Sequence, residues 1–179
     1  LNRKEKELTL KEMEKIAQSL GHLTFLDISG GEPFLRKDLP TVLEVFDKYC
    51  RPGYVNIPTN CLLPTKIVKS LQTILDNTNF PVSLNLSLDG LPETHDKIRG
   101  VKGNFAKVEE TWQRVKVLKR RYPKLSVKIS TVVSNQNLEE IEELSEFVAS
   151  QMKGIDFHTL ILMRGSPLSS QFSLPPLKQ

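Results

Sequence analysis

Apolar residues recur three or four positions apart in five stretches of the chain, the spacing that places them on one face of an α-helix. The first stretch follows Thr9, which forms with Glu12 the Thr-x-x-Glu pattern of a helix N-terminal capping box. Asp38 and Asn137 stand where they can begin the second and fifth helices, and Pro64 begins the third. The expected inward positions are Leu10, Met13, Ile16, Ala17 and Leu20, then Leu39, Val42, Leu43, Phe46 and Tyr49, then Ile67, Val68, Leu71, Ile74 and Leu75, then Val108, Trp112, Val115 and Leu118, and last Ile141, Leu144, Phe147 and Val148.

Short apolar runs rich in β-branched residues separate these helices. They occupy residues 23–28, 54–57, 82–88, 125–133 and 155–162. Strands that start roughly 30 to 40 residues apart, with a helix between each pair, pair in parallel through right-handed crossovers. The fold class is therefore α/β with a parallel sheet, as an open doubly wound sheet or as most of a barrel. The nearly continuous apolar character of the strands predicts burial on both faces.

Composition narrows the class of protein further. The 179 residues are 39% apolar and 26% charged, with no apolar run long enough to span a membrane, which indicates a soluble globular domain. The net charge of +4 is mild and spread along the chain, so we expect no nucleic-acid partner. Two cysteines without a disulfide or metal-binding spacing suit a reducing compartment, and we expect a cytoplasmic location.

The sequence at each end of the chain leads to one further expectation about how the protein is organised. The N-terminus does not begin with methionine, which suggests a piece of a longer protein. Residues 166–179 are rich in proline and serine, and we interpret them as a loop or linker that follows a domain of residues 1–165.

The most informative stretch lies after the first predicted strand, where an apolar run ends in Gly30-Gly31-Glu32-Pro33. Two adjacent glycines allow backbone conformations closed to other residues and expose peptide groups to a ligand, while Pro33 stops the strand. Glu32 then offers a carboxylate to a cation. A backbone cradle with one carboxylate suits the α-ammonium group of an amino acid, although a tight turn with a solvated glutamate is equally compatible with these four residues.

Small and polar residues also follow the other predicted strands. They are Thr59 and Asn60, then Ser87, Asp89 and Gly90, then Ser134 and Asn135, and finally Met163, Arg164 and Gly165. In parallel α/β folds the carboxyl ends of the strands lie at one rim, which is where ligands bind. Each of these residues alone is an ordinary turn or loop residue. Together they predict a ligand-binding site at this rim of the sheet.

This ordered series resembles the radical S-adenosylmethionine (radical SAM) superfamily. The motifs are Ser29-Gly30-Gly31-Glu32-Pro33-Phe34-Leu35, Thr59-Asn60, Ser87-Leu88-Asp89-Gly90 and His95-Asp96-Lys97-Ile98-Arg99. They are most similar to the branch that contains molybdenum-cofactor cyclases and SPASM-type peptide and protein modifiers. The resemblance runs from about Leu8 to Gly165.

The resemblance implies a partial, TIM-like (β/α)6 barrel of which this chain supplies strands two to six. It implies S-adenosylmethionine as cofactor, with Gly30, Gly31, Glu32 and Pro33 holding its methionine moiety. By the same resemblance Thr59 lies beside the cofactor, Ser87 contacts its ribose or carboxylate, Arg99 pairs with its carboxylate, and Leu162 with Met163 flanks adenine. A plain structural role remains open for Arg99 as a solvated helix residue and for Leu162 as barrel core.

One departure from the family pattern concerns its CxxxCxxC loop, whose three thiolates hold a [4Fe–4S] cluster. The chain has no such motif, and neither Cys50 nor Cys61 is a credible cluster ligand, so we assign no metal ligand here. We expect the loop just upstream in a parent enzyme that uses an electron donor and an unknown peptide, protein or small-molecule substrate. The alternatives are a non-catalytic binding or interaction module that has lost the loop, and an unrelated α/β small-molecule enzyme. An isolated chain without the first strand is also expected to self-associate.

Overall fold

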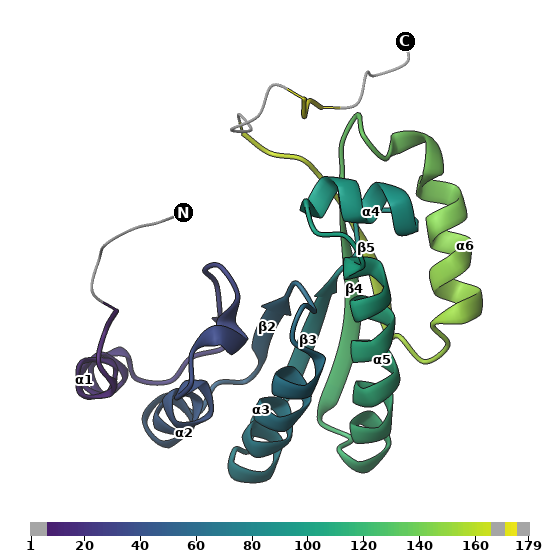
Figure 1. Ribbon diagram of the computed structural model, residues 1–179. Helices are drawn as coiled ribbons and strands as arrows, with labels where there is room; N and C mark the ends of the chain where they lie inside the picture. The colour runs from purple at the N-terminus through teal and green to yellow at the C-terminus, as the bar shows by residue number, and fades with distance from the viewer. Residues whose placement is uncertain (1–6, 166–170, 175–179) are drawn as a thin grey trace.

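The computed structural model describes residues 7–165 and 171–174. Within them a five-stranded, all-parallel sheet alternates with helices (Figure 1). The strands are β1 (Leu26–Asp27), β2 (Val55–Thr59), β3 (Val82–Ser87), β4 (Leu125–Val133) and β5 (Phe157–Leu162). The α-helices are α1 (Leu10–Leu20), α2 (Leu39–Cys50), α3 (Pro64–Asn77), α4 (Pro92–Arg99), α5 (Asn104–Arg121) and α6 (Ile141–Gln151), with short 3-10 helices η1 (Pro33–Leu35) and η2 (Leu138–Glu140).

The order of the strands distinguishes the two architectures that the sequence left open. The strands lie in the order β1-β2-β3-β4-β5, so every strand neighbours the next one in the chain. A doubly wound sheet reverses its order at a switch point, whereas a barrel adds each strand beside the last. The sheet is therefore a curled half-barrel, which confirms the partial TIM-like barrel.

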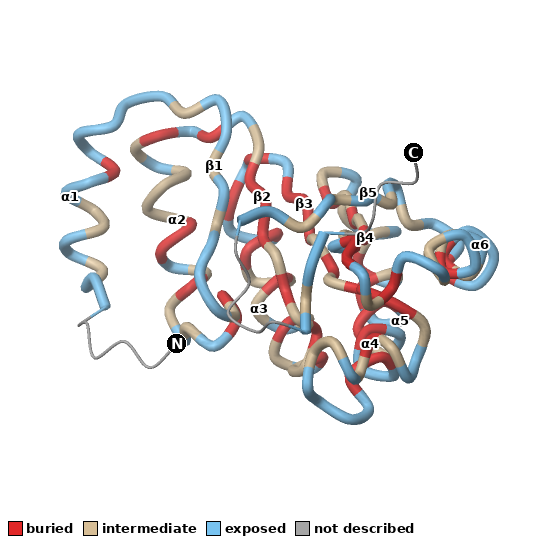
Figure 2. The backbone as a smooth tube through the Cα atoms, turned by 90° about the horizontal axis from the view of Figure 1, so that it is seen from above, coloured by how far each residue is buried: buried red, intermediate tan, exposed pale blue. Residues whose placement is uncertain are grey.

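The main core lies between one face of this sheet and the helices. Val55 and Ile57 of β2 and Leu84 of β3 are fully buried in the same cluster as Leu71 of α3 and Trp112 of α5. In Figure 2 the buried residues concentrate along β2, β3 and β4 and on the adjoining helices, whereas α1 is mostly exposed or intermediate. Two exposed apolar residues of α1 belong to its predicted inward face, namely Ile16 and Leu20.

The other face of the sheet is buried along β2 and most of β3, as predicted, but not along β4 and β5. Residues of β4 alternate between buried and partly or fully exposed positions, and only two residues of β5 are partly buried. For these two strands the expectation of burial on both faces is wrong. A half-barrel has helices on its outer face only, so its inner face looks into open space rather than onto a second helical layer.

Several boundaries differ from the sequence-based expectation. The strand expected over residues 23–28 is only the two-residue β1, while β4 has the predicted bounds. The Thr9–Glu12 capping box is confirmed. Asp38 occupies the N-cap position of α2 as predicted, but its side chain makes no capping hydrogen bond and its carboxylate pairs with Arg36 at 2.8 Å. The linker expected over residues 166–179 lies largely outside the described residues, and residues 171–174 form neither helix nor strand. No helix among the residues described is long and apolar enough to cross a bilayer.

Candidate active site

The Gly-Gly-Glu-Pro segment leaves β1 as a loop and turns into η1. Gly30 has φ +131°, a conformation that L-residues with a side chain rarely adopt, so a glycine is required there. A Cβ atom added at Gly30 or Gly31 meets no atom within 4 Å, which means that the space beside both peptide groups is open. The segment lines a groove of about 1000 Å³ together with residues of α1 and α2.

The Glu32 carboxylate is held in place by the neighbouring strand end. It accepts hydrogen bonds from Thr59 Oγ1 at 3.0 and 3.1 Å, from the Asn60 backbone N–H at 2.7 Å and from the Phe34 N–H at 3.2 Å. Among the residues described it pairs with no Lys, Arg or His. A partly buried carboxylate that is oriented by neutral donors alone retains an uncompensated negative charge for a cationic ligand.

The strand end that holds Glu32 has an unusual backbone. Cys61 is fully buried with φ +64°, and its N–H donates to Thr59 Oγ1 at 3.1 Å. Burial raises the pKa of the Cys61 thiol far above its usual value, and the nearby Glu32 charge adds to this effect. The thiol is therefore an inert packing group rather than a nucleophile or a ready metal ligand.

A second polar group lies at the ends of β3 and β4. Asp89 is 3% exposed, and its carboxylate accepts the Val132 N–H at 2.8 Å and pairs with Arg99 Nη2 at 2.7 Å. Asn137 donates to the Asp89 and Val132 carbonyls at 2.6 and 2.9 Å. Arg99 is thus committed to an ion pair with Asp89, while its Nε has no hydrogen-bond partner in the described part of the chain.

A buried histidine connects this group to the start of α4. His95 is fully buried, and its Nδ1 accepts the Asp89 backbone N–H at 3.0 Å. Because Nδ1 accepts, the ring carries its proton on Nε2, which has no partner among the residues described. Burial, followed by the Arg99 charge, lowers the pKa of His95 below its usual value, so the ring is neutral at pH 7.

The structure brings some of the predicted site residues together and leaves others apart. Glu32 and Thr59 are in contact, and Gly30, Gly31 and Pro33 flank Glu32 in the same loop. Ser87 ends β3 as a half-buried residue beside Ser130 of β4. Leu162 ends β5 and is 59% exposed, so it is not part of the core in this chain.

Sequence reasoning missed Asn104, the first residue of α5, which contacts the strand end that holds Glu32. Its Nδ2 donates to the Asn60 carbonyl at 3.0 Å, and the side chain is almost completely buried. An asparagine after a glycine at a helix start has the sequence signature of an ordinary cap, so the pattern gave no hint of this contact.

The comparisons with known proteins agree with this geometry. The family model described as the Radical SAM superfamily matches residues 1–148. The chain belongs to the radical SAM superfamily. S-Adenosylmethionine and a [4Fe–4S] cluster are accordingly the cofactors that membership of this family supports.

Individual radical SAM relatives match only in part. The Fe-coproporphyrin III synthase of Methanosarcina barkeri (strain Fusaro / DSM 804) is 39% identical over 80 residues, which are 43% of this chain and 18% of that protein. Two solved structures of anSMEcpe share the fold: one with bound AdoMet and the Kp18Cys peptide (TM-score 0.62, 20% identity) and one with AdoMet alone (TM-score 0.63, 19% identity). Each alignment covers 86% of this chain and 41% of that one, so the chain spans less than half the length of the relatives that it matches.

The residues present fit the two radical SAM cofactors unequally. The open glycine cradle and the unpaired Glu32 carboxylate fit the amino-acid end of S-adenosylmethionine. The chain offers no ligands for the [4Fe–4S] cluster, because its only two cysteines are both buried and lie in different parts of the fold. Cys50 ends α2, and its thiol donates to the Ala17 carbonyl at 3.2 Å. The described residues contain no group of three or more His, Cys, Asp or Glu side chains that could hold a metal ion.

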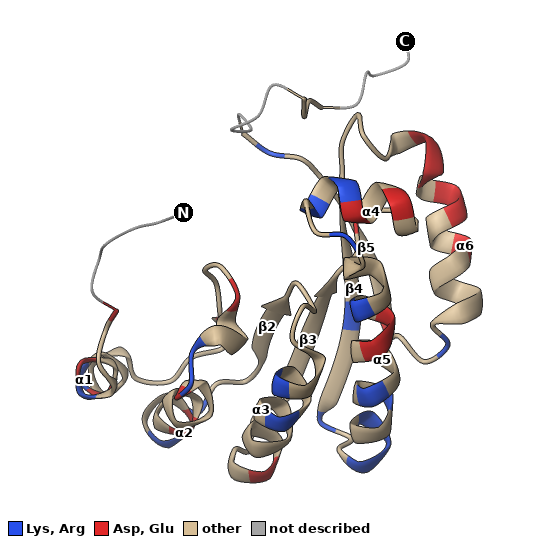
Figure 3. Cartoon of the chain, in the orientation of Figure 1, with Lys and Arg blue, Asp and Glu red and all other residues tan. Residues whose placement is uncertain are grey.

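Lys and Arg residues are distributed over the helices rather than gathered in one patch, and acidic residues mark the start of α6 (Figure 3).

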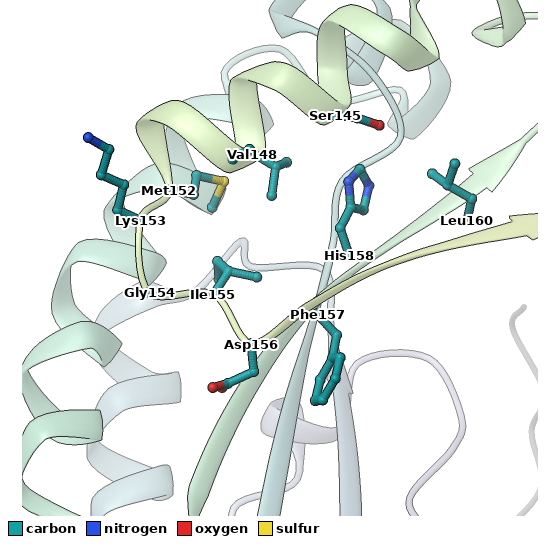
Figure 4. Close-up of a pocket in the computed structure, with 11 residues that line it drawn as sticks. Ser145, Val148, Met152, Lys153, Gly154, Ile155, Asp156, Phe157, His158 and Leu160 are labelled. Atoms are coloured by element: carbon teal, nitrogen blue, oxygen red, sulfur yellow. The ribbon is translucent and has the colours of Figure 1, made fainter.

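A second groove, of about 360 Å³, lies between α6 and β5, apart from the candidate site. It is lined by Val148, Met152, His158 and Leu160 among others (Figure 4). It contains none of the predicted site residues, and its position on the helical side of β5 makes it a gap in the outer layer.

Proposed function

We propose that this chain is the cofactor-binding portion of a radical SAM enzyme. The observation that carries the proposal is the Glu32 carboxylate, which is oriented by three neutral donors, has no cation among the described residues, and adjoins the open peptide groups of Gly30 and Gly31. When bound to a reduced cluster, S-adenosylmethionine supplies a 5′-deoxyadenosyl radical that abstracts hydrogen from a substrate.

In this proposal the residues of the chain position the cofactor. Glu32 receives the α-ammonium group, the peptide groups of Gly30 and Gly31 meet the methionine backbone, and Pro33 fixes the exit of the loop. Thr59 keeps the carboxylate in place through its hydroxyl. A preorganised carboxylate of this kind loses little entropy when the cation arrives.

The remaining assignments are weaker contacts in the same proposal. Ser87 offers a hydroxyl to the ribose or the carboxylate, and Leu162 offers an apolar surface to adenine. Arg99 has five N–H donors and uses one nitrogen for Asp89, so it retains donors for the cofactor carboxylate. The Asp89 pair would hold the guanidinium in a fixed orientation for that contact.

The cluster thiolates and the electron donor belong, in this proposal, to parts of the parent outside these 179 residues. The test uses the full-length parent protein and measures the affinity for S-adenosylmethionine by calorimetry. We expect Glu32→Ala to weaken binding about 10- to 100-fold, because a charge-assisted hydrogen bond contributes roughly 1.5–3 kcal/mol. Cys61→Gly is the control, since glycine adopts the positive φ without strain and the thiol is directed into the core.

The two variants also separate cofactor binding from folding. Cys61→Gly should change the affinity less than about threefold while both variants keep a cooperative unfolding transition. Equal affinities for the two variants would remove the role assigned to Glu32. A full-length protein that binds no S-adenosylmethionine would instead favour the non-catalytic binding module.

A further inference from the structure

The peptide group between Leu88 and Asp89 is held at both of its polar atoms by buried side chains. Its N–H donates to His95 Nδ1 at 3.0 Å, and its carbonyl accepts a hydrogen bond from Thr131 Oγ1. His95 and Thr131 are both fully buried. Because a peptide group is planar, two buried partners on opposite sides fix its orientation, and with it the direction in which the Asp89 side chain leaves the backbone.

The two side chains that hold this peptide group come from different elements of the fold. His95 lies in α4, and its ring packs edge-on against Phe105 of α5, with ring centroids 6.2 Å apart. Thr131 lies in β4, and its hydroxyl contacts Nε2 of His158 on β5 at 2.9 Å. Since the hydroxyl donates its single hydrogen to the Leu88 carbonyl, it accepts from His158. The orientation of the peptide group therefore depends on α4, β4 and β5 together.

The Asp89 carboxylate connects this peptide group to Arg99. Its Oδ2 pairs with Arg99 Nη2 at 2.7 Å, and its Oδ1 accepts the Val132 N–H at 2.8 Å. Arg99 lies one turn after His95 on α4, so one helix supplies both the acceptor for the Asp89 N–H and the cation for its carboxylate. The Arg99 side chain is 28% exposed and that of Asp89 only 5%, so the guanidinium is the member of the pair that a ligand can reach.

The acceptor on His95 decides where the Asp89 N–H points. Asp89 is buried, and a buried N–H that lost the imidazole nitrogen would turn towards another acceptor, because buried peptide groups are almost always hydrogen-bonded. The Asp89 side chain would turn with it. Arg99 would follow, since its pair with Asp89 is the only ion pair that it forms among the described residues.

We propose that His95 is a positioning residue for Arg99: by accepting the Asp89 N–H, it holds the guanidinium where it meets the carboxylate of the cofactor. This inference rests on the proposed function, in which the ligand of Arg99 is the carboxylate of S-adenosylmethionine. His95 then contributes to the preference for a carboxylate and not to the contact between Glu32 and the α-ammonium group. A residue that only supported the fold would affect both ends of the cofactor alike.

The experiment measures the affinity of the full-length protein for two probes by calorimetry. The probes are S-adenosylmethionine and its decarboxylated form, which keeps the adenosine, the sulfonium and the ammonium group but has no carboxylate. The unsubstituted protein should prefer the carboxylate at least about tenfold, the contribution of one charge-assisted pair. His95→Gln should lower this preference to below about threefold, while its affinity for the decarboxylated probe stays within about twofold, because that probe makes no contact through Arg99.

His95→Asn is the matched control. The asparagine Oδ1 is as many bonds from the backbone as the imidazole Nδ1, whereas the glutamine Oε1 is one bond further, like Nε2. Both variants place a neutral amide in the same site, but only His95→Asn keeps an acceptor for the Asp89 N–H, so it should retain most of the preference for the carboxylate.

A second variant acts on the same peptide group from its other side. Thr131→Val keeps the shape of the side chain and removes the hydroxyl that binds the Leu88 carbonyl. It should also lower the preference for the carboxylate, and it decides the question if His95→Gln lacks a cooperative unfolding transition.

A double-mutant cycle tests whether His95 acts through Arg99. Arg99→Gln alone should remove most of the preference for the carboxylate. Adding His95→Gln to it should then change the preference by less than about twofold, because coupled residues give non-additive effects. Additive losses would overturn the route from His95 to Arg99.

The outcomes separate this inference from the proposed function. If S-adenosylmethionine binds but His95→Gln weakens both probes equally, or leaves the preference unchanged, the inference is wrong and the proposed function stands. Equal affinity of the unsubstituted protein for the two probes would likewise overturn the inference alone. An unsubstituted protein that binds neither probe would overturn the proposed function, and the inference with it.

Discussion

Asn60 joins the first two strand ends to α5 through its backbone, and its side-chain oxygen accepts a further hydrogen bond. Its N–H donates to Glu32 at 2.7 Å, its carbonyl accepts from Asn104, and its Oδ1 accepts the Leu62 N–H at 3.0 Å. The Asn104 side chain in turn comes from the first residue of α5. The position of the Glu32 carboxylate therefore depends on helix packing some 70 residues further along the chain, rather than on its own loop alone.

His95 gives the fold a defined pH dependence. Burial lowers its pKa in the folded state, as it does for His158, so the unfolded chain binds more protons than the folded chain below the ordinary histidine pKa. Stability is then complete above about pH 6.5 and falls as the pH is lowered towards the folded values. Urea unfolding should show a lower free energy of unfolding at pH 5.5 than at pH 7.5, by at most about 1.4 kcal/mol per pH unit for each histidine.

Two asparagine variants test the assignment of this pH effect. His95→Asn keeps an acceptor for the Asp89 N–H and should reduce the loss between pH 7.5 and 5.5, even if the variant is less stable at both values. His22 is exposed, so His22→Asn should retain the full loss. An unchanged pH dependence in His95→Asn would contradict the role of His95.

The residues of the site were predictable where the chemistry depends on local sequence. Gly30, Gly31 and Glu32 indicate a loop whose peptide groups are accessible. The Thr59 hydroxyl contacts Glu32, as expected when two neighbouring strands end side by side. The Asp89–Arg99 pair was not predicted, because each residue is also an ordinary turn or helix residue. Only the packing of α4 over the strand ends brings the two charges together.

At the scale of elements, the junction between α4 and α5 is held by Asp96. Its carboxylate accepts the Phe105 N–H at 2.9 Å and also the Gly103 N–H, which are donors at the start of α5. These backbone hydrogen bonds lower the pKa of Asp96. One carboxylate on α4 thereby takes the place of a side-chain cap on α5, whose own N-cap residue is Gly103.

Removing this contact should cost about as much as removing a helix cap. Asp96→Ala is expected to lower the free energy of unfolding by roughly 1–2 kcal/mol, measured by urea denaturation at pH 7. Asp96→Asn retains one acceptor and should lose less. Glu93→Ala, an exposed acidic residue in the first turn of α4, is the control and should change stability by under about 0.5 kcal/mol. Similar losses for Glu93→Ala and Asp96→Ala would contradict the capping role.

The elements themselves followed from periodicity, with failures at particular places. The apolar run over residues 125–133 and the helical spacing around Trp112 predicted β4 and α5, and both elements bury an apolar face. The first strand is shorter than its apolar run, since pairing with β2 is limited to two residues. The sequence alone could not show how short β1 is, because the length of an edge strand depends on how many of its residues pair with the neighbouring strand. Asp38 was expected as a cap, but the nearby Arg36 guanidinium captures its carboxylate.

At the scale of the whole molecule, the half-barrel formed by residues 7–165 and 171–174 has two edges, of very different size, at which no further strand pairs. The edge at β1 has two residues, whereas the edge at β5 has six. Large apolar residues are exposed at β5, with Phe157 66%, Leu160 47% and Leu162 59% exposed. A long apolar edge is a template for pairing with another chain, so the self-association expected of this chain should involve β5 more than β1.

Sedimentation equilibrium of the isolated 179-residue chain should therefore show concentration-dependent association. The double substitution Phe157→Lys/Leu160→Lys places charges on both faces of β5 and should shift the chain towards monomer, since charged edge strands resist pairing. Val117→Lys adds a lysine at a 64% exposed apolar site on α5, away from both edges, and should leave association unchanged. A monomeric unsubstituted chain at all concentrations would contradict the exposed-edge argument. Equal suppression by Val117→Lys would show that net charge, rather than the β5 edge, governs association.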